Sequence, residues 1–382
     1  MAGNNRWRGV ARPMSLVLAG LFAAQLAHAA GDVDAVVARA ASEFMAAPGA
    51  VGISIGVLQS GVAHGYHFGT VSRAHLQLPD DRSIYPIASL TKTFTGTLLA
   101  QAALDKKLKL DDDVRGYLGA GYANLAFEQQ PIRLYHLLNH RSGLPFILPN
   151  PPQAAPGFEN DAVPFPQRID EIVARSSRED FYADLRRVKL TAAPGSHFQY
   201  SNAAAQLLGY MLEGIYQDSF EALVNQRIAA PLGMRDTFIT PTAQQASRMT
   251  VGYDENGVRQ PYAPDKFQAA GALKSSLADM LGYARWQLAE GDPAVKLSHQ
   301  PTYVSDDFSI GLNWQMLKHG GRRVIWQDGA VPGFASLLVL QPDSGIAMVL
   351  LANELDPGTL GRLRKLANGI SSALDTSSLA VP

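Results

Sequence analysis

The sequence contains no cysteine, which excludes disulfide bonds and thiolate metal sites. It also lacks an excess of either charge. Its 33 basic and 34 acidic residues leave a net charge of −1, which gives no reason to expect a nucleic-acid partner. Internal repeats and low-complexity runs are absent as well. With 382 residues, 47% of them hydrophobic and 18% charged, the chain is expected to form a soluble globular protein of about two domains.

The first 29 residues have the pattern of a secretory signal peptide. Three arginines at positions 6, 8 and 12 precede an apolar run over residues 16–26, which is too short to span a bilayer comfortably. Ala27-His28-Ala29 then matches the small-x-small pattern of a cleavage site. We expect cleavage near Ala29, a periplasmic or secreted mature protein, and no stable membrane span. An uncleaved anchor is the alternative.

Hydrophobic periodicity predicts strands near both ends of the chain and helices between them. Strands are expected over residues 51–58, 62–69, 309–316, 323–327, 334–341 and 346–352, and helices over residues 32–45, 89–105, 132–140, 168–190, 203–216, 219–230, 279–290 and 360–374. The expected fold class is α+β: an antiparallel sheet from both chain ends, flanked by helices, with a mostly helical insertion. The expected domains are a sheet domain (30–88 plus 303–376) and a helical domain (89–302), with the active site at their junction.

One short stretch combines a serine and a lysine at helical spacing. Ser89 and Lys92 are three residues apart where an extended region changes to a helix, so their side chains lie on one face. A serine hydroxyl becomes a good nucleophile when a neighbouring base takes its proton, and a partly desolvated amine could be that base. Alone, the pattern is weak, because a serine at a helix start is often an N-cap and such a lysine is often exposed.

Several other patterns could also carry chemistry. Ser54 lies in a Gly-x-Ser-x-Gly pattern, but the predicted strand continues through it without the sharp turn that a nucleophile elbow needs. His136 and His140 have a zinc-like spacing without an obvious third ligand, so buried or capping histidines are expected instead. Residues 145–166 contain seven prolines and form either a site wall or a surface excursion.

Three motifs together resemble one family. They are Ser89-Leu90-Thr91-Lys92, Tyr200-Ser201-Asn202 and Gln327-Asp328-Gly329. The set is similar to the Ser-x-x-Lys, Tyr-x-Asn and Lys-Thr-Gly motifs of the serine β-lactamase and penicillin-binding-protein superfamily, and it resembles most closely the class C β-lactamase branch. Within that branch the chain looks most like D-alanyl-D-alanine carboxypeptidase/endopeptidases of the AmpH type. A second Tyr-x-Asn, Tyr122-Ala123-Asn124, lacks the Pro-Gly approach and the following helix, so Tyr200 is preferred.

The resemblance implies a role for each group. Ser89 is the residue that becomes acylated, and Lys92 and Tyr200 share the proton transfers, with either as the base. Asn202 holds the substrate amide, and the backbone N–H groups of Ser89 and Ala330 form the oxyanion hole, with Gly329 allowing close approach. No metal or cofactor is implied.

The third motif departs from the family pattern. Gln327 and Asp328 are expected to contact the substrate, but Gln327 is neutral where a lysine or histidine usually meets a substrate carboxylate, and the negative Asp328 would repel it. Arg141 and Arg323 are possible substitutes for the missing cation. The sequence therefore predicts a secreted serine hydrolase, first as a peptidoglycan D-alanyl-D-alanine peptidase acting on muropeptides. A carboxylesterase and a β-lactamase are the alternatives, with β-lactams as possible acylating ligands. A non-catalytic cell-wall-binding protein is a remote alternative.

Overall fold

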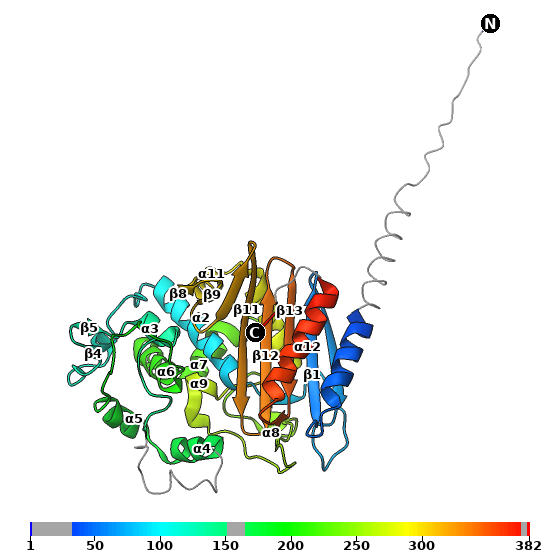
Figure 1. The fold of residues 1–382 in the computed structure, drawn as a ribbon, viewed down its shortest axis with the longest axis horizontal. Helices are drawn as coiled ribbons and strands as arrows, with labels where there is room; N and C mark the ends of the chain where they lie inside the picture. Colours follow the sequence, from blue (N-terminus) through cyan, green and yellow to red (C-terminus); the bar gives the residue numbers. More distant parts are fainter. Residues whose placement is uncertain (2–32, 151–164, 376–379) are drawn as a thin grey trace.

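The structure is a computed structural model that describes residue 1 and residues 33–150, 165–375 and 380–382 (Figure 1). The expected signal peptide, apart from residue 1, and most of the proline-rich stretch, residues 151–164, lie outside the described residues. In the described part of the chain, no helix is both long and apolar enough to cross a membrane.

An eight-stranded antiparallel sheet joins the two ends of the chain. Its strand order is β2-β1-β13-β12-β11-β10-β9-β8, and β1 pairs directly with β13, so that Ile53 lies opposite Ala352. The strands are β1 (Gly52–Gln59), β2 (Val62–Gly69), β8 (Tyr303–Ser305), β9 (Phe308–Ile310), β10 (Gln315–His319), β11 (Arg322–Val331), β12 (Phe334–Gln341) and β13 (Ile346–Ala352). The expected sheet from both chain ends, flanked by helices, is confirmed.

Helices cover both faces of this sheet. On one face, the helix over residues 33–45 and α12 (Thr359–Leu374) lie side by side and bury their apolar sides against Ile55 and its neighbours (Figure 1). On the other face, α10 (Leu277–Ala289) packs against β1 and β13. The domain boundaries expected after residues 88 and 302 stay a prediction. Helix α10, from the expected helical part, packs directly on the sheet.

Helix α2 (Thr91–Leu104) lies at the centre of the helical part. It packs against α6 (Asn202–Tyr216), α9 (Gln268–Gly271) and α11 (Pro293–Ser298), and every residue from position 91 to 100 is buried. Burial on all sides requires partners for its hydroxyl groups. Thr95 Oγ1, for example, donates to the carbonyl oxygen of Ala269 at 2.8 Å. The first ten residues of the helix are thus buried on all sides, whereas Leu104 at its end is exposed.

Shorter elements complete the structure. The helices are α3 (Leu134–Leu138), α4 (Phe165–Arg175), α5 (Arg178–Leu185), α7 (Phe220–Val224) and α8 (Ala243–Ala246), with 3-10 turns η1 (Ala88–Leu90), η2 (Val114–Tyr117) and η4 (Asp265–Phe267), and a π-helical segment η3 (Asn225–Ala229). The small strands are β3 (Ile84–Pro86), β4 (Ala126–Phe127), β5 (Gln130–Pro131), β6 (Tyr253–Asp254), β7 (Lys274–Ser276) and β14 (Glu354–Leu355).

Several expected elements have the wrong extent, among them the strand expected over residues 323–327, which is the longer β11. Residues 309–316 are not one strand, because β9 ends at Ile310 and Asn313 adopts a left-handed φ of 61° while its Nδ2 donates to the carbonyl oxygen of Lys92. Residues 168–190 form two helices, since Ser177 caps the start of α5. The helix expected over residues 132–140 is limited to α3.

The contact between α2 and the β9–β10 connection generates a stability prediction. A Cβ on Gly96 would lie 2.1 Å from the carbonyl oxygen of Leu312, so Gly96→Ala forces buried backbone apart. We expect a loss of about 2–3 kcal/mol in the free energy of unfolding, measured by urea denaturation.

Gly369→Ala is the matched control, because Gly369 lies inside α12 with open space around its Cβ position. Alanine has the higher helix propensity, so this variant should gain about 0.5–1 kcal/mol. Equal effects of the two substitutions would contradict the close approach.

Candidate active site

Ser89 lies in a short turn that two pieces of backbone hold in place. Strand β3 pairs with β7, and the Ile87 N–H donates to the Leu273 carbonyl at 3.0 Å, which fixes the approach to the serine. Ala88, immediately before it, has a left-handed φ of 48°, an uncommon conformation for a residue with a side chain. Ser89 follows in η1, directly before α2, so its hydroxyl lies at the helix start as the motif predicted.

Lys92 is fully buried below Ser89 and makes three polar contacts. Its Nζ lies 2.9 Å from Ser89 Oγ, 2.7 Å from Asn202 Oδ1 and 2.6 Å from the Ala270 carbonyl oxygen. A neutral amine has two N–H groups and one lone pair. It can donate to the two oxygens that only accept and receive the hydroxyl proton. Burial lowers the pKa of Lys92 to about 7, with the charge of Asp328 opposing the shift.

Tyr200 completes the contacts of the Ser89 hydroxyl from the other side. Its phenol oxygen lies 2.7 Å from Ser89 Oγ, and its ring centroid lies 4.9 Å from Lys92 Nζ. Burial raises the pKa of Tyr200, so the phenol keeps its proton near neutral pH. The ring of His140 packs against the Tyr200 ring, with 4.4 Å between the ring centroids. Burial lowers the pKa of His140 to about 3, which keeps the imidazole uncharged. Of Lys92, Tyr200 and His140, Lys92 is therefore the one whose pKa lies near neutrality.

The expected oxyanion hole lies where β11 passes the serine turn. A Cβ on Gly329 would lie 2.8 Å from both the Ile87 carbonyl oxygen and the Ser89 nitrogen. Only glycine permits that approach. Ala330 is the next residue and lines the same cavity as Ser89. From this position its backbone N–H can reach the carbonyl group that reacts with Ser89.

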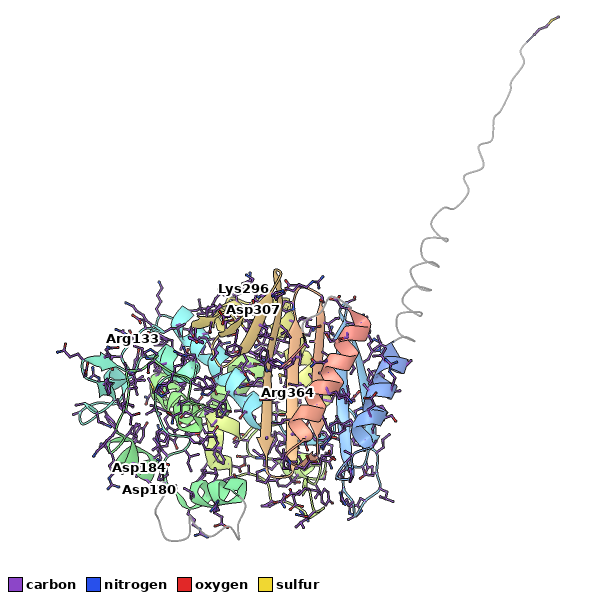
Figure 2. All side chains as sticks on the ribbon, viewed as in Figure 1. Arg133, Asp180, Asp184, Lys296, Asp307 and Arg364 are labelled. Atoms are coloured by element: carbon purple, nitrogen blue, oxygen red, sulfur yellow. The ribbon has the colours of Figure 1, made fainter. Side chains whose placement is uncertain are left out.

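The remaining residues of the third motif lie on opposite faces of β11. Gln327 is buried on the face toward the serine turn, where its Oε1 accepts a hydrogen bond from Gln315 Nε2 at 3.0 Å. Asp328 lies on the other face in an ion pair with Arg364, which projects from α12 (Figure 2). Asp328 was expected to bind or repel substrate directly. Its side chain instead contacts α12 and influences the site through its charge.

The alternative candidates have structural partners elsewhere. Ser54 is buried inside β1, with its hydroxyl 2.9 Å from His67 Nδ1 and 3.0 Å from Tyr85 OH. Asn124 of the second Tyr-x-Asn donates to the carbonyls of Leu185 and Val188. His136 accepts from the Arg133 N–H at the start of α3.

The two arginines considered as carboxylate partners are engaged as well. Arg141 donates to the Gly195 carbonyl oxygen, and its guanidinium lies 3.8 Å from the centroid of the Tyr303 ring. Arg323 pairs with Glu290.

Fold and site together define a serine hydrolase of the β-lactamase/transpeptidase-like fold. The family model described as Beta-lactamase matches residues 37–369, and the chain belongs to that family. The AmpH D-alanyl-D-alanine-carboxypeptidase/endopeptidase of Escherichia coli (strain K12) is 25% identical over 88% of this chain and 87% of its own length. A protein of Pseudomonas fluorescens named Beta-lactamase is 26% identical over 91% of this chain and its own full length.

A solved structure shows the same fold. The beta-lactamase/D-alanine carboxypeptidase from Yersinia pestis, crystallised with citrate, superposes with a TM-score of 0.73 at 23% identity. The match covers 90% of this chain and 98% of the other. The resemblance to this superfamily, first inferred from three motifs, is thereby confirmed.

Sequence reasoning missed several residues around the serine. Asp170 of α4 and Phe267 line the cavity beside Ser89, and the Ala270 carbonyl accepts from Lys92. No motif marks Asp170 or Phe267, because their place depends on how α4 and η4 pack over the site. His140 was considered in the sequence only for its spacing from His136, so its contact with Tyr200 was missed.

The lowered pKa of Lys92 predicts the pH dependence of acylation. If the neutral amine accepts the Ser89 proton, the acylation rate should rise with pH through about 7 and reach a plateau above it. Stopped-flow measurement of the acylation rate across pH 5–9 records this rise, which we call the acylation limb. Lys92→Arg keeps the group charged, so it should lower the plateau rate at least ~100-fold and remove the limb.

Asp328→Asn tests the electrostatic cause of that pKa. The negative charge of Asp328 raises the pKa of Lys92, so its removal should move the acylation limb to lower pH. A pH profile that does not move would contradict the electrostatic effect of Asp328 on Lys92.

Proposed function

We propose that the protein hydrolyses acyl bonds through an acyl-enzyme on Ser89 and that its natural substrates are D-alanyl-D-alanine peptides of peptidoglycan. The Ser89 hydroxyl between Lys92 and Tyr200, 2.9 and 2.7 Å away, carries the mechanistic part. Similarity to a D-alanyl-D-alanine carboxypeptidase/endopeptidase over most of the chain supports the substrate. The signal-like N-terminus agrees with a periplasmic or secreted enzyme, because such a substrate lies outside the cytoplasm.

The proposed reaction has two halves. Ser89 Oγ attacks the carbonyl carbon while the neutral Lys92 amine takes its proton, and the backbone N–H groups of Ser89 and Ala330 stabilise the oxyanion. The intermediate collapses to an ester on Ser89. The protonated Lys92 returns its proton through the Tyr200 hydroxyl to the leaving amine. Water then attacks the ester, and its proton restores the serine hydroxyl as the acid departs.

Ester hydrolysis is the second candidate, and Gln327 is the observation that favours it. Lysine or histidine at this position of the family would meet a substrate carboxylate, whereas Gln327 is neutral and hydrogen-bonded to Gln315. A charge-assisted hydrogen bond contributes about 1.5–3 kcal/mol. Its loss weakens carboxylate-bearing substrates and leaves uncharged esters unaffected.

A labelling experiment tests the acyl-enzyme. Fluorescent penicillin should label the wild type covalently and fail to label Ser89→Ala, because the acylated oxygen is absent. Ser54→Ala is the control for the other motif serine and should label like the wild type. Incubation with muropeptides followed by mass spectrometry should show release of D-alanine or cleavage of cross-links. Ester turnover without either product would contradict the peptidase and leave the esterase.

Substitution of Gln327 tests the origin of substrate choice. Gln327→Lys places a cation on the face of β11 that carries Gly329, so kcat/KM for D-alanyl-D-alanine peptides should rise about 10–100-fold. The rates are compared above pH 8, on the expected plateau of the Lys92 limb. Gln327→Met has a similar length and no charge, and should give no such gain. A gain with methionine would assign the effect to packing.

A further inference from the structure

A cavity of about 250 Å³ opens directly beside Ser89. Its walls are mostly apolar, with Phe146, Ile169, Phe267, Val331 and Leu355 among the lining residues. Asn202 and Ala330, the residues expected to hold the substrate amide and the oxyanion, also line it. A substrate bound to Ser89 would therefore extend one of its parts into this cavity.

Asp170 is the only residue with a formal charge among the described residues that line this cavity. It projects from α4, and its Oδ2 atom is buried without a hydrogen-bond partner among the residues that the structure describes. Its neighbour Glu171 faces solvent and pairs with Arg175. A carboxylate placed in an apolar cavity without a partner is unfavourable, because burial removes its hydration. The same burial raises the pKa of Asp170 to about 7.

We propose that Asp170 binds an ammonium group on the acyl part of the substrate and so selects cationic acyl donors. The inference rests on the proposed acyl-enzyme at Ser89. A bound ammonium supplies the missing partner of Asp170 and restores its ionised form. A carboxylate in the same place would meet a like charge and no described cation in the cavity wall. The neutral Gln327 agrees with this preference, because the site also lacks the family's usual partner for an anionic group.

Three p-nitrophenyl esters test the charge preference directly. The 4-(trimethylammonio)butanoate ester carries a permanent cation, the 5,5-dimethylhexanoate ester has the same shape without charge, and the adipate monoester carries a carboxylate. For the wild type, kcat/KM should be about tenfold higher for the cationic ester than for the neutral one, and lowest for the anionic one. Because tenfold corresponds to about 1.4 kcal/mol, the effect is well above assay error.

Variants at two adjacent positions of α4 assign the effect. Asp170→Asn keeps the shape and removes the charge, so the ratio between cationic and neutral esters should fall to about one. Asp170→Glu should retain a ratio well above one. Glu171→Gln makes the same charge change on the solvent side and should leave the ratio at the wild-type value. The ratio is independent of the fraction of folded enzyme, which circular dichroism monitors.

The outcomes separate this inference from the proposed function. Equal rates for the three esters, or a preference that Asp170→Asn leaves intact, overturn the role of Asp170 while the acyl-enzyme stands. If the wild type neither turns over any ester nor is labelled by penicillin, the acyl-enzyme is overturned, and the inference falls with it.

Discussion

The burial of Lys92 is the constraint on which the rest of the site depends. Removing an ammonium from water costs several kcal/mol unless hydrogen bonds compensate it or the group becomes neutral. Here both occur: the pKa of Lys92 falls to about 7, and three oxygens surround its Nζ. Those oxygens come from the serine turn, from α6 and from α9. One side chain therefore ties three separate segments together, and the same desolvation that makes it costly makes it a base.

Close backbone approaches bring the helical part and the sheet to the distances that this arrangement needs. Gly96 lets α2 meet the β9–β10 connection, and Gly329 lets β11 meet the serine turn. Between these contacts, Asn313 bridges to the backbone of Lys92 itself. The lysine thus lies on a helix that is held from both sides. This rigidity matters because an acyl-transfer site must hold its donors within about 0.5 Å of the productive geometry.

The sequence was informative wherever a pattern is local. The β-branched, alternating segment of β1 and the apolar runs of β12 and β13 predicted the bounds of these strands closely, since a strand buried on both faces reads as a continuous apolar run. The i, i+3 spacing placed Lys92 beneath Ser89. Prediction from the sequence failed where contacts between distant parts of the chain determine the local structure. The left-handed Asn313 interrupts an otherwise strand-like segment. Asp170 reaches the cavity only through the packing of α4, which no spacing along the chain encodes. Asp328 faces α12 because side chains alternate between the two faces along β11. A predicted strand that reached Val331 would have placed Asp328 on that face.

The distribution of charge around Ser89 indicates how this chain differs within its family. A neutral amide pair stands where a cation was expected on β11, the neighbouring Asp328 forms an ion pair with Arg364 on the far face, and Asp170 lies in the cavity wall. Each leaves the contacts of Ser89, Lys92 and Tyr200 in place. The neutral Gln327 and the carboxyl group of Asp170 both make an anionic group less favourable, whereas the ion pair with Arg364 offsets the negative charge of Asp328. In the proposed function, the groups that act on Ser89 come mainly from α2 and α6, and the charges that the substrate meets come mainly from β11 and α4.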